Sequence, residues 1–186
     1  KILYLYSGPR HYLDMQCTAN KFKYPVTIDF IDGKISHDHN LLDDLFAASL
    51  IAKVRAGEYD GIIMAPPCST YSAVRGYADG PQPLRGADHI TIFGLPDLSP
   101  QNKKIVREAT SLSLRCLDFA DAADEAGIPY IIENPAQLND NSPNLFIIPQ
   151  FLQRIQSGNM HIRRVAQCQY GAATVKPTTL GTNFLL

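Results

Sequence analysis

Short apolar runs alternate along the chain with longer stretches in which apolar residues recur at helical spacing. The apolar runs predict strands, because most are bounded by turn-forming or acidic residues. We expect strands at residues 1–6, 26–30, 61–65 and 130–133, a short strand at 35–38, and strand-like segments at 164–170 and 178–182. Helices are expected at 11–20, 41–56, 99–126 and 149–157. This alternation predicts an α/β fold with a doubly wound, mostly parallel sheet.

The helix expected at 99–126 has clear signals at both ends. Ser99 is a suitable N-cap, Pro100 suits the first turn, and Gly127 suits the end of the helix. The preceding segment, 71–98, is rich in Gly and Pro and shows little periodicity. We therefore expect a long loop there, and loops of that length are usually functional or mobile.

Composition narrows the class of protein. A chain of 186 residues, 45% hydrophobic and 19% charged, predicts one globular domain. No apolar run approaches the length of a membrane span, so no membrane association is expected. The four cysteines lack paired or zinc-ligand spacing, which favours a reduced intracellular compartment, cytoplasmic or nuclear. His37 and His39 lack a third ligand, so no metal site is predicted.

The clearest chemical feature lies where two expected strands end. The apolar run at 61–65 leads through Pro66 and Pro67 to Cys68, and the run at 130–133 ends in Glu133. Ligands of open α/β sheets bind at the carboxyl ends of the strands. A thiol and a carboxylate at that edge are candidates for a nucleophile and its proton-handling partner. The alternatives are a buried packing thiol and a helix-capping carboxylate.

The turn after the first strand is a candidate cofactor site. Tyr6-Ser7-Gly8 precedes a helix, and backbone N–H groups at a helix N-terminus favour anions or carboxylates. Neither a Gly-x-Gly-x-x-Gly motif nor a Walker phosphate loop is present, which argues against NAD and ATP. Asp29 would accept hydrogen bonds from two ribose hydroxyls, and Asp38 or Asp43 would reach an adenine amino group. The alternatives are a simple tight turn at Gly8 and a capping role for Asp29.

Several motifs together carry a family resemblance. Leu5-Tyr6-Ser7-Gly8, Ala65-Pro66-Pro67-Cys68-Ser69-Thr70-Tyr71-Ser72, Glu133-Asn134-Pro135 and Tyr170-Gly171 fall in the order and spacing of the cytosine-C5 DNA methyltransferase family. The chain looks closest to the small single-domain relatives of phages and mobile elements, which end in Tyr-Gly…Lys-Pro-Thr-Thr. The resemblance implies a Rossmann-like, S-adenosylmethionine-dependent methyltransferase fold. It also implies that residues 1–186 form one catalytic domain without a separate target-recognition domain.

The resemblance assigns roles to individual residues. Cys68 would add to C6 of cytosine, and Glu133 would hydrogen-bond N3 and the exocyclic amine while C5 accepts the methyl group. A base in duplex must leave the stack before these groups reach it. The implied residues around S-adenosylmethionine are Tyr6, Ser7, Gly8, Asp29, Phe30, Asp38 and Pro66. The implied residues around the substrate are Pro67, Ser69, Arg75, Asn134 and Lys176.

Nucleic acid is the expected partner, with DNA favoured over RNA, and a separate recognition domain or partner protein would supply sequence specificity. The net charge of −1 gives no general attraction to nucleic acid, so binding would depend on local basic patches. Two candidate patches are the loop residues Arg75, Arg85 and His89, which would contact phosphates, and the cluster of Arg163, Arg164 and Lys176.

The chain also departs from the family pattern. Arg10 stands where the family has a second glycine, and Ser69 and Pro135 replace glutamine and valine. Thr174, Lys176 and Thr178 align with the Gln-x-Arg-x-Arg motif, so only Lys176 keeps its type of charge. These departures leave open a methyltransferase-fold module that binds cofactor or nucleic acid without turnover.

Two other enzyme classes fit the residues less well. Ala65-Pro66-Pro67-Cys68 loosely resembles the Asp/Asn/Ser-Pro-Pro-aromatic motif of N4 and N6 amino-methyltransferases. That motif needs a hydrogen-bond acceptor first and an aromatic residue last, and Ala65 and Cys68 are neither. A cysteine hydrolase would need a histidine partner at a strand end, which the sequence does not show.

Overall fold

The computed structural model describes residues 1–12, 14–77, 79–170 and 175–185. Its six-stranded sheet has the order β2-β1-β3-β4-β6-β5. The strands are β1 Ile2–Leu5, β2 Ile28–Ile31, β3 Gly61–Met64, β4 Tyr130–Pro135, β5 His161–Ala166 and β6 Pro177–Thr182. The neighbouring pairs among β1 to β4 are parallel, and β6 runs antiparallel to both β4 and β5. The expected mostly parallel α/β sheet is confirmed.

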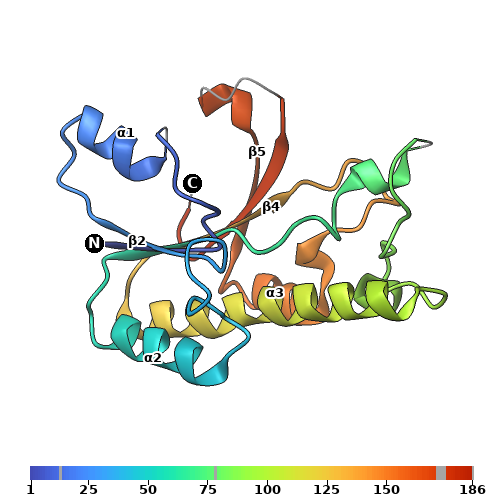
Figure 1. The fold of residues 1–186 in the computed structure, drawn as a ribbon, viewed down its shortest axis with the longest axis horizontal. Helices are drawn as coiled ribbons and strands as arrows, with labels where there is room; N and C mark the ends of the chain where they lie inside the picture. The colour runs from blue at the N-terminus through green and yellow to red at the C-terminus, as the bar shows by residue number, and fades with distance from the viewer. Residues whose placement is uncertain (13, 78, 171–174, 186) are drawn as a thin grey trace.

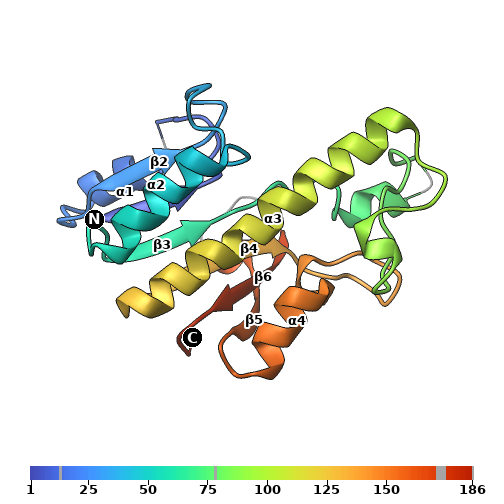
Figure 2. The same cartoon turned by 90° about the horizontal axis from the view of Figure 1, so that it is seen from below.

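Helices cover both faces of the sheet. The α-helices are α1 Met15–Lys21, α2 Asp44–Arg55, α3 Pro100–Ala126 and α4 Pro149–Gln156. Four short 3₁₀ helices are η1 Ala73–Gly76, η2 Thr91–Phe93, η3 Leu145–Ile147 and η4 Gln167–Tyr170. α1 lies on one face, and α2, α3 and α4 lie on the other (Figures 1 and 2). The sheet is therefore doubly wound, as expected. None of the described helices is long and apolar enough to cross a membrane.

The core lies between the sheet and α3. Alternate residues of each strand point to this side, and those of β1 and β3 are fully buried or nearly so: Leu3, Leu5, Ile62 and Met64. α3 contributes a strip of small and aromatic residues that includes the fully buried Phe119. Its ends follow the sequence signals, since Ser99 caps Asn102 N–H and Gly127 takes the left-handed φ of 67° that ends the helix.

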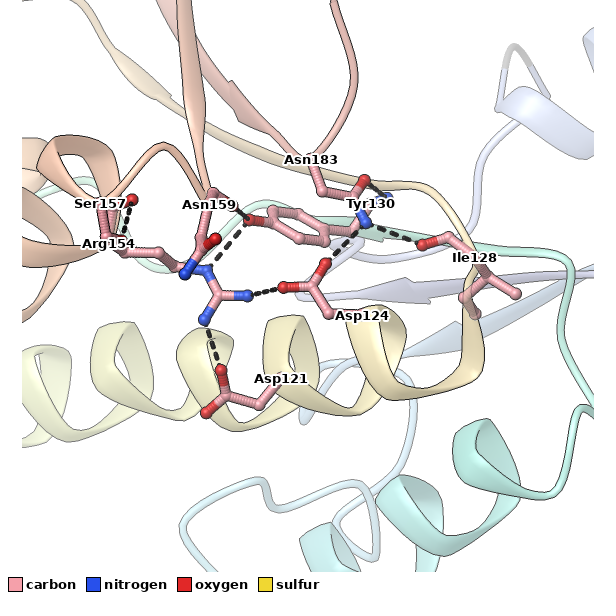
Figure 3. A network of polar contacts seen from close by, with 8 residues as sticks. All are labelled: Asp121, Asp124, Ile128, Tyr130, Arg154, Ser157, Asn159 and Asn183. Carbon is pink, nitrogen blue, oxygen red and sulfur yellow. Dashed lines mark hydrogen bonds and ion pairs between the residues drawn. The ribbon is translucent and has the colours of Figure 1, made fainter.

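A polar network holds the first residue of β4 in place. Arg154 of α4 forms ion pairs with Asp121 and Asp124 of α3, and its Nε lies 3.2 Å from the hydroxyl of Tyr130, the first residue of β4 (Figure 3). Asn183, just after β6, donates to Asp124 and accepts from the Tyr130 N–H. The network joins two helices and two strands, so it fixes the start of the strand that carries Glu133.

Three expected elements differ from the structure, each because a side chain takes a backbone hydrogen bond. α1 begins at Met15 rather than at residue 11, because Asp14 is the cap that accepts from the Cys17 N–H. Residues 35–38 form turns instead of a strand, after Asp32 accepts from the Lys34 N–H in a local turn. α2 begins at Asp44, and the Asp43 carboxylate caps it rather than being free to reach a ligand.

Strand β5 also differs from the expected segment. Its bounds are His161–Ala166, and residues 167–170 form η4 instead of continuing the strand.

Candidate active site

A cleft of about 700 Å³ opens at the carboxyl edge of the sheet. The chain leaves β1 toward α1 on one face and leaves β3 toward α3 on the opposite face, so the connections diverge between these neighbouring strands. Such a topological switch point is where open α/β sheets bind ligands. The lining comes from the carboxyl-end segments of β1 to β4, from the loop before α2 and from α3, and it includes Tyr6, Gly8, Asp32, Cys68 and Glu133.

The segment after β3 brings Cys68 to this cleft. Ala65, Pro66, Pro67, Cys68 and Ser69 line it in succession. The segment is held in two ways, because the N–H of the buried Tyr71 donates to the Cys68 carbonyl at 2.9 Å and Arg75 Nε donates to the Ser69 carbonyl at 2.7 Å. Cys68 is a free, half-buried thiol in a braced loop. Such a group is accessible to a ligand in the cleft and restricted in its position.

Glu133 enters the same cleft from β4. Residues of β4 alternate between faces, so Tyr130, Ile132 and Asn134 are buried on one side while Glu133 points to the other. Its Oε1 accepts from Lys176 Nζ at 3.0 Å and from Gln167 Nε2 at 3.3 Å, and Thr178 Oγ1 lies 3.5 Å away. No described residue bonds Oε2. One oxygen is therefore anchored and the other is available to a ligand.

Gln167 was not among the residues predicted from the sequence. It comes from η4, which lies between β5 and β6, and its backbone N–H donates to the Lys176 carbonyl at 3.1 Å. A segment expected to be strand-like gave no sign that this side chain turns toward β4. The only signal was its position just before the Tyr170-Gly171 motif.

The turn after β1 supplies the opposite side of the cleft. Gly8 has φ 71°, which favours glycine, and its N–H donates to Asp32 Oδ2 at 2.9 Å. Asp32 Oδ1 accepts from the Lys34 N–H at 2.7 Å, so each carboxylate oxygen keeps one lone pair for a ligand. The Tyr6 hydroxyl donates to the Leu112 carbonyl at 2.9 Å, and burial raises the pKa of this phenol well above its usual value of 10.

Asp29 does not line the cleft. It is the second residue of β2, and its carboxylate accepts from the Tyr59 hydroxyl and pairs with Lys1 Nζ, at 2.9 and 2.6 Å. Partial burial raises the pKa of Asp29, but the hydrogen bonds from Lys1 and Tyr59 outweigh it, and the pKa lies below its usual value. The carboxylate that the structure brings to the cleft is Asp32, directly after the last residue of β2.

Three other predicted cofactor residues also lie outside the lining. Asp38 is exposed in a turn. Phe30 is buried beneath the guanidinium of Arg10, whose central carbon lies 4.0 Å from the ring centroid. The Ser7 hydroxyl donates to the Gly8 carbonyl. Tyr6, Gly8 and Pro66 are the predicted cofactor residues that do line the cleft.

The predicted substrate residues separate into three groups. Pro67 and Ser69 line the cleft, and Lys176 reaches it through Glu133. Arg75 lines a second, neighbouring cleft. Asn134 is fully buried on the other face of β4, and its amide has no hydrogen-bond partner among the described residues.

Of the predicted departures from the family pattern, Thr178 lies beside Glu133, whereas Thr174 lies outside the described residues. Among the described residues, no three His, Cys, Asp or Glu side chains gather closely enough to hold a metal ion.

Comparison with known proteins gives limited information. No family model and no curated protein matches the chain. Among solved structures, it is similar to the Schizosaccharomyces pombe Dnmt2 methyltransferase, with 13% identity, a TM-score of 0.42, and coverage of all of this chain and 50% of that one. It is also similar to the Entamoeba histolytica methyltransferase EhMeth, with 9% identity, a TM-score of 0.44, and coverage of 99% and 53%. The chain thus spans about half the length of either protein, and likeness at this level establishes no activity for it.

Proposed function

We propose that this chain transfers a methyl group from S-adenosylmethionine to C5 of cytosine in nucleic acid, with DNA favoured over RNA. The observation that supports this proposal is the meeting of Cys68 and Glu133 in one cleft at the switch point of the sheet. They come from adjacent parallel strands, β3 and β4. A nucleophile and a carboxyl group that line the same cleft are what covalent activation of a cytosine ring requires.

Cys68 would act on the ring as a thiolate. C5 of cytosine is a poor nucleophile, and addition of sulfur to C6 converts the ring into an enamine whose C5 is electron-rich. S-adenosylmethionine, when bound, supplies an electrophilic methyl group for that carbon. After transfer, a base removes the C5 proton, the C6–S bond breaks, and Cys68 leaves as a thiolate. The braced loop around Cys68 holds the sulfur in position for both steps.

Glu133 would orient the base and stabilise it during addition. Oε2, which no described residue bonds, would accept a hydrogen bond from the exocyclic amine, and the carboxyl would also hydrogen-bond N3, where charge develops as sulfur adds to C6. Lys176 and Gln167 hold Oε1, so the carboxyl plane is set before the substrate arrives. Lys176 also places a positive charge beside the site, which favours a polyanionic substrate.

The residues around the turn after β1 fit S-adenosylmethionine. Asp32 retains lone pairs for the two ribose hydroxyls, and Gly8 has nothing within 4 Å of where a Cβ would stand, so a ligand can approach the backbone closely. Tyr6 and Pro66 supply apolar walls on either side. These residues would bind and orient the cofactor beside Cys68.

The test is transfer of a labelled methyl group from S-adenosylmethionine to duplex DNA, single-stranded DNA, RNA and cytosine nucleotides. The label should appear at C5 and vanish in Cys68→Ala, while Cys17→Ala, which removes another free thiol from the exposed surface of α1, should keep full activity. A 5-fluorocytosine substrate should form a stable adduct with the wild-type protein only. Transfer that survives Cys68→Ala would refute the covalent mechanism.

The position of Arg10 favours a second candidate, a module that binds cofactor or nucleic acid without turnover. Arg10 pairs with Asp14 at 2.5 Å and covers the ring of Phe30, so a charged side chain follows the first turn where the family has a glycine. Calorimetry with S-adenosylmethionine separates the two functions. Binding without transfer to any of the four substrates would support the module and overturn the enzyme.

A further inference from the structure

A second cleft, of about 390 Å³, borders the loop that carries Cys68. The same loop contributes to both clefts, because Cys68 and Ser69 line the first while Thr70 and Ser72 line the second. The other walls come from the long 71–98 loop and from the loop after β4. The lining includes Arg75, Tyr77, Arg85, Leu138, Asn139 and Asn141.

The lining of this second cleft is positively charged. It contains Arg75 and Arg85, several hydroxyl and amide groups, and no Asp or Glu among the described residues. Near the protein surface, a positive charge without a carboxylate partner attracts anions, and the attraction strengthens where solvent is excluded. The second cleft is thus suited to a ligand that carries negative charge.

Arg85 is the fixed charge of this cleft. It is only 2% exposed, yet each acceptor that it contacts is neutral: the Thr70 and Thr110 hydroxyls and the carbonyls of Ile92 and Val106. Its guanidinium also lies 4.2 Å from the centroid of the Tyr71 ring. Because a guanidinium stays protonated, a buried positive charge without a counter-ion among the described residues lies beside the cleft.

Arg75 is the adaptable charge. Its Nε and Nη1 donate to the carbonyls of Ser69 and Gln82, at 2.7 and 2.9 Å. Its Nη2 has no acceptor among the described residues. A guanidinium anchored on one side and free on the other is well suited to a phosphate oxygen.

Exposed apolar side chains stand at the rim. Tyr77 is 59% exposed and Leu138 is 43% exposed, and they come from the two different loops that form the walls. An exposed aromatic ring beside basic groups is the usual platform on which single-stranded bases stack. Asn139 and Asn141 add amides beside this platform.

We propose that the second cleft binds a phosphodiester group and the neighbouring base of the strand whose cytosine occupies the first cleft. This inference rests on the proposed function, because it takes the first cleft to hold the target base. The two clefts share one short loop, so a strand that enters the first extends across the second. The second cleft would therefore hold the strand in register with Cys68 through its backbone and one stacked base.

The experiment measures binding of short labelled single strands, each with one cytosine, by fluorescence anisotropy at a series of salt concentrations. Arg75→Gln should reduce the slope of log affinity against log salt by about 0.7, the share of one phosphate contact on a single strand. Tyr77→Ala, whose side chain makes no hydrogen bond to any residue that the structure describes, should weaken binding roughly tenfold through loss of stacking. Lys53→Gln, at an exposed position of α2, is the matched control and should change neither quantity.

The outcomes separate this inference from the proposed function. If the salt slope and the affinity are unchanged in both variants, the proposed strand-binding role of the second cleft is wrong, even if the wild-type protein methylates cytosine. A reduced slope in Arg75→Gln without methyl transfer would support the second cleft and overturn the proposed enzyme. A wild-type protein that transfers methyl groups to free deoxycytidine monophosphate but binds no strand would overturn both the role of the second cleft and the nucleic-acid substrate, and would leave the Cys68 chemistry standing.

Discussion

Removing Arg154 should destabilise the fold measurably, because its guanidinium joins α4, α3 and β4. The side chain is 12% exposed and forms ion pairs with Asp121 and Asp124 and a hydrogen bond with Tyr130 (Figure 3). Arg154→Met keeps the aliphatic part of the side chain and removes all three polar contacts. The change therefore tests the network with little loss of packing.

The exposure of the partners sets the magnitude. Asp121 and Asp124 are 58% and 37% exposed, so water solvates them when the arginine is lost, and each pair contributes no more than a surface ion pair. The hydroxyl of the fully buried Tyr130 keeps its bond to the Asn159 carbonyl but loses the arginine. We expect the free energy of unfolding to fall by about 2 kcal/mol, below the loss for a fully buried pair.

Urea denaturation followed by circular dichroism measures this change in the free energy of unfolding. In a thermal scan, the melting temperature should fall by about 4–8 °C for a chain of this size. Arg55→Met is the matched control. Arg55 pairs with Glu125 at 2.5 Å, but both side chains are about half exposed, so we expect a clearly smaller loss than for Arg154→Met. Equal losses in the two variants would refute the reasoning, since burial and the bond to Tyr130 would then add nothing.

Other changes test the site and the first turn. Lys176→Met should lower kcat/KM for methyl transfer about 10- to 100-fold, because Glu133 Oε1 loses its closest donor. Lys176→Arg keeps the positive charge and should keep most of the activity. Equal losses of activity in the two variants would argue against an orienting charge at this position. Calorimetry should show that Asp32→Asn weakens S-adenosylmethionine binding about tenfold or more, whereas Asp29→Asn leaves it unchanged. The reverse result would restore Asp29 as the ribose ligand. The Asp14 pKa is held at about 2 by its arginine partner, so its ion pair stabilises the fold above the ordinary carboxyl range and is lost as pH falls through about 2. The stability difference between the wild-type protein and Asp14→Asn should therefore be constant above about pH 4 and shrink below it, and a difference that stays constant down to pH 2 would contradict the assignment.

The sheet, and the arrival of Cys68 and Glu133 at one edge of it, could be predicted from the sequence because those features depend on local patterns. Apolar runs of strand length, separated by helical stretches, are sufficient to predict a mostly parallel sheet. The parallel strands of such a sheet all have their carboxyl ends at the same edge. Cys68 and Glu133 end two such runs, so the topology alone brings them to the same edge. Their arrival in one cleft follows from the order of β3 and β4.

The carboxylate that reaches the cleft could not be chosen from the sequence because it depends on where β2 ends. Asp29 and Asp32 are three residues apart, and both follow apolar residues. The register of β2 with β1 places Asp29 opposite Leu3, inside the strand pair, and leaves Asp32 beyond its last residue. The expected strand ended at residue 30 and β2 ends at Ile31, and a shift of this size changes which carboxylate reaches the edge, since strand ends are the least certain part of such a prediction.

The residues around Glu133 and in the second cleft depend on contacts between distant segments. Gln167 meets Glu133 only because β6 runs antiparallel beside β4 and η4 then lies over the strand end. Arg85 reaches α3 through a loop without periodicity, so neither its burial nor its lack of a carboxylate partner could be predicted from its neighbours.

The pair Glu133 and Asn134 shows how strand geometry divides two adjacent polar residues between two environments. Successive side chains of a strand point to opposite faces, so one of the two must enter the cleft and the other must enter the core beneath β4. An amide buried without a partner destabilises a fold by about 1–3 kcal/mol. The fold holds Asn134 in that position while Glu133 makes three contacts in the cleft. Polar groups at positions where packing favours apolar ones are typical of functional sites. The buried amide of Asn134 follows the proposed cytosine-binding carboxylate in the sequence, and it supports placing the chemistry at the end of β4.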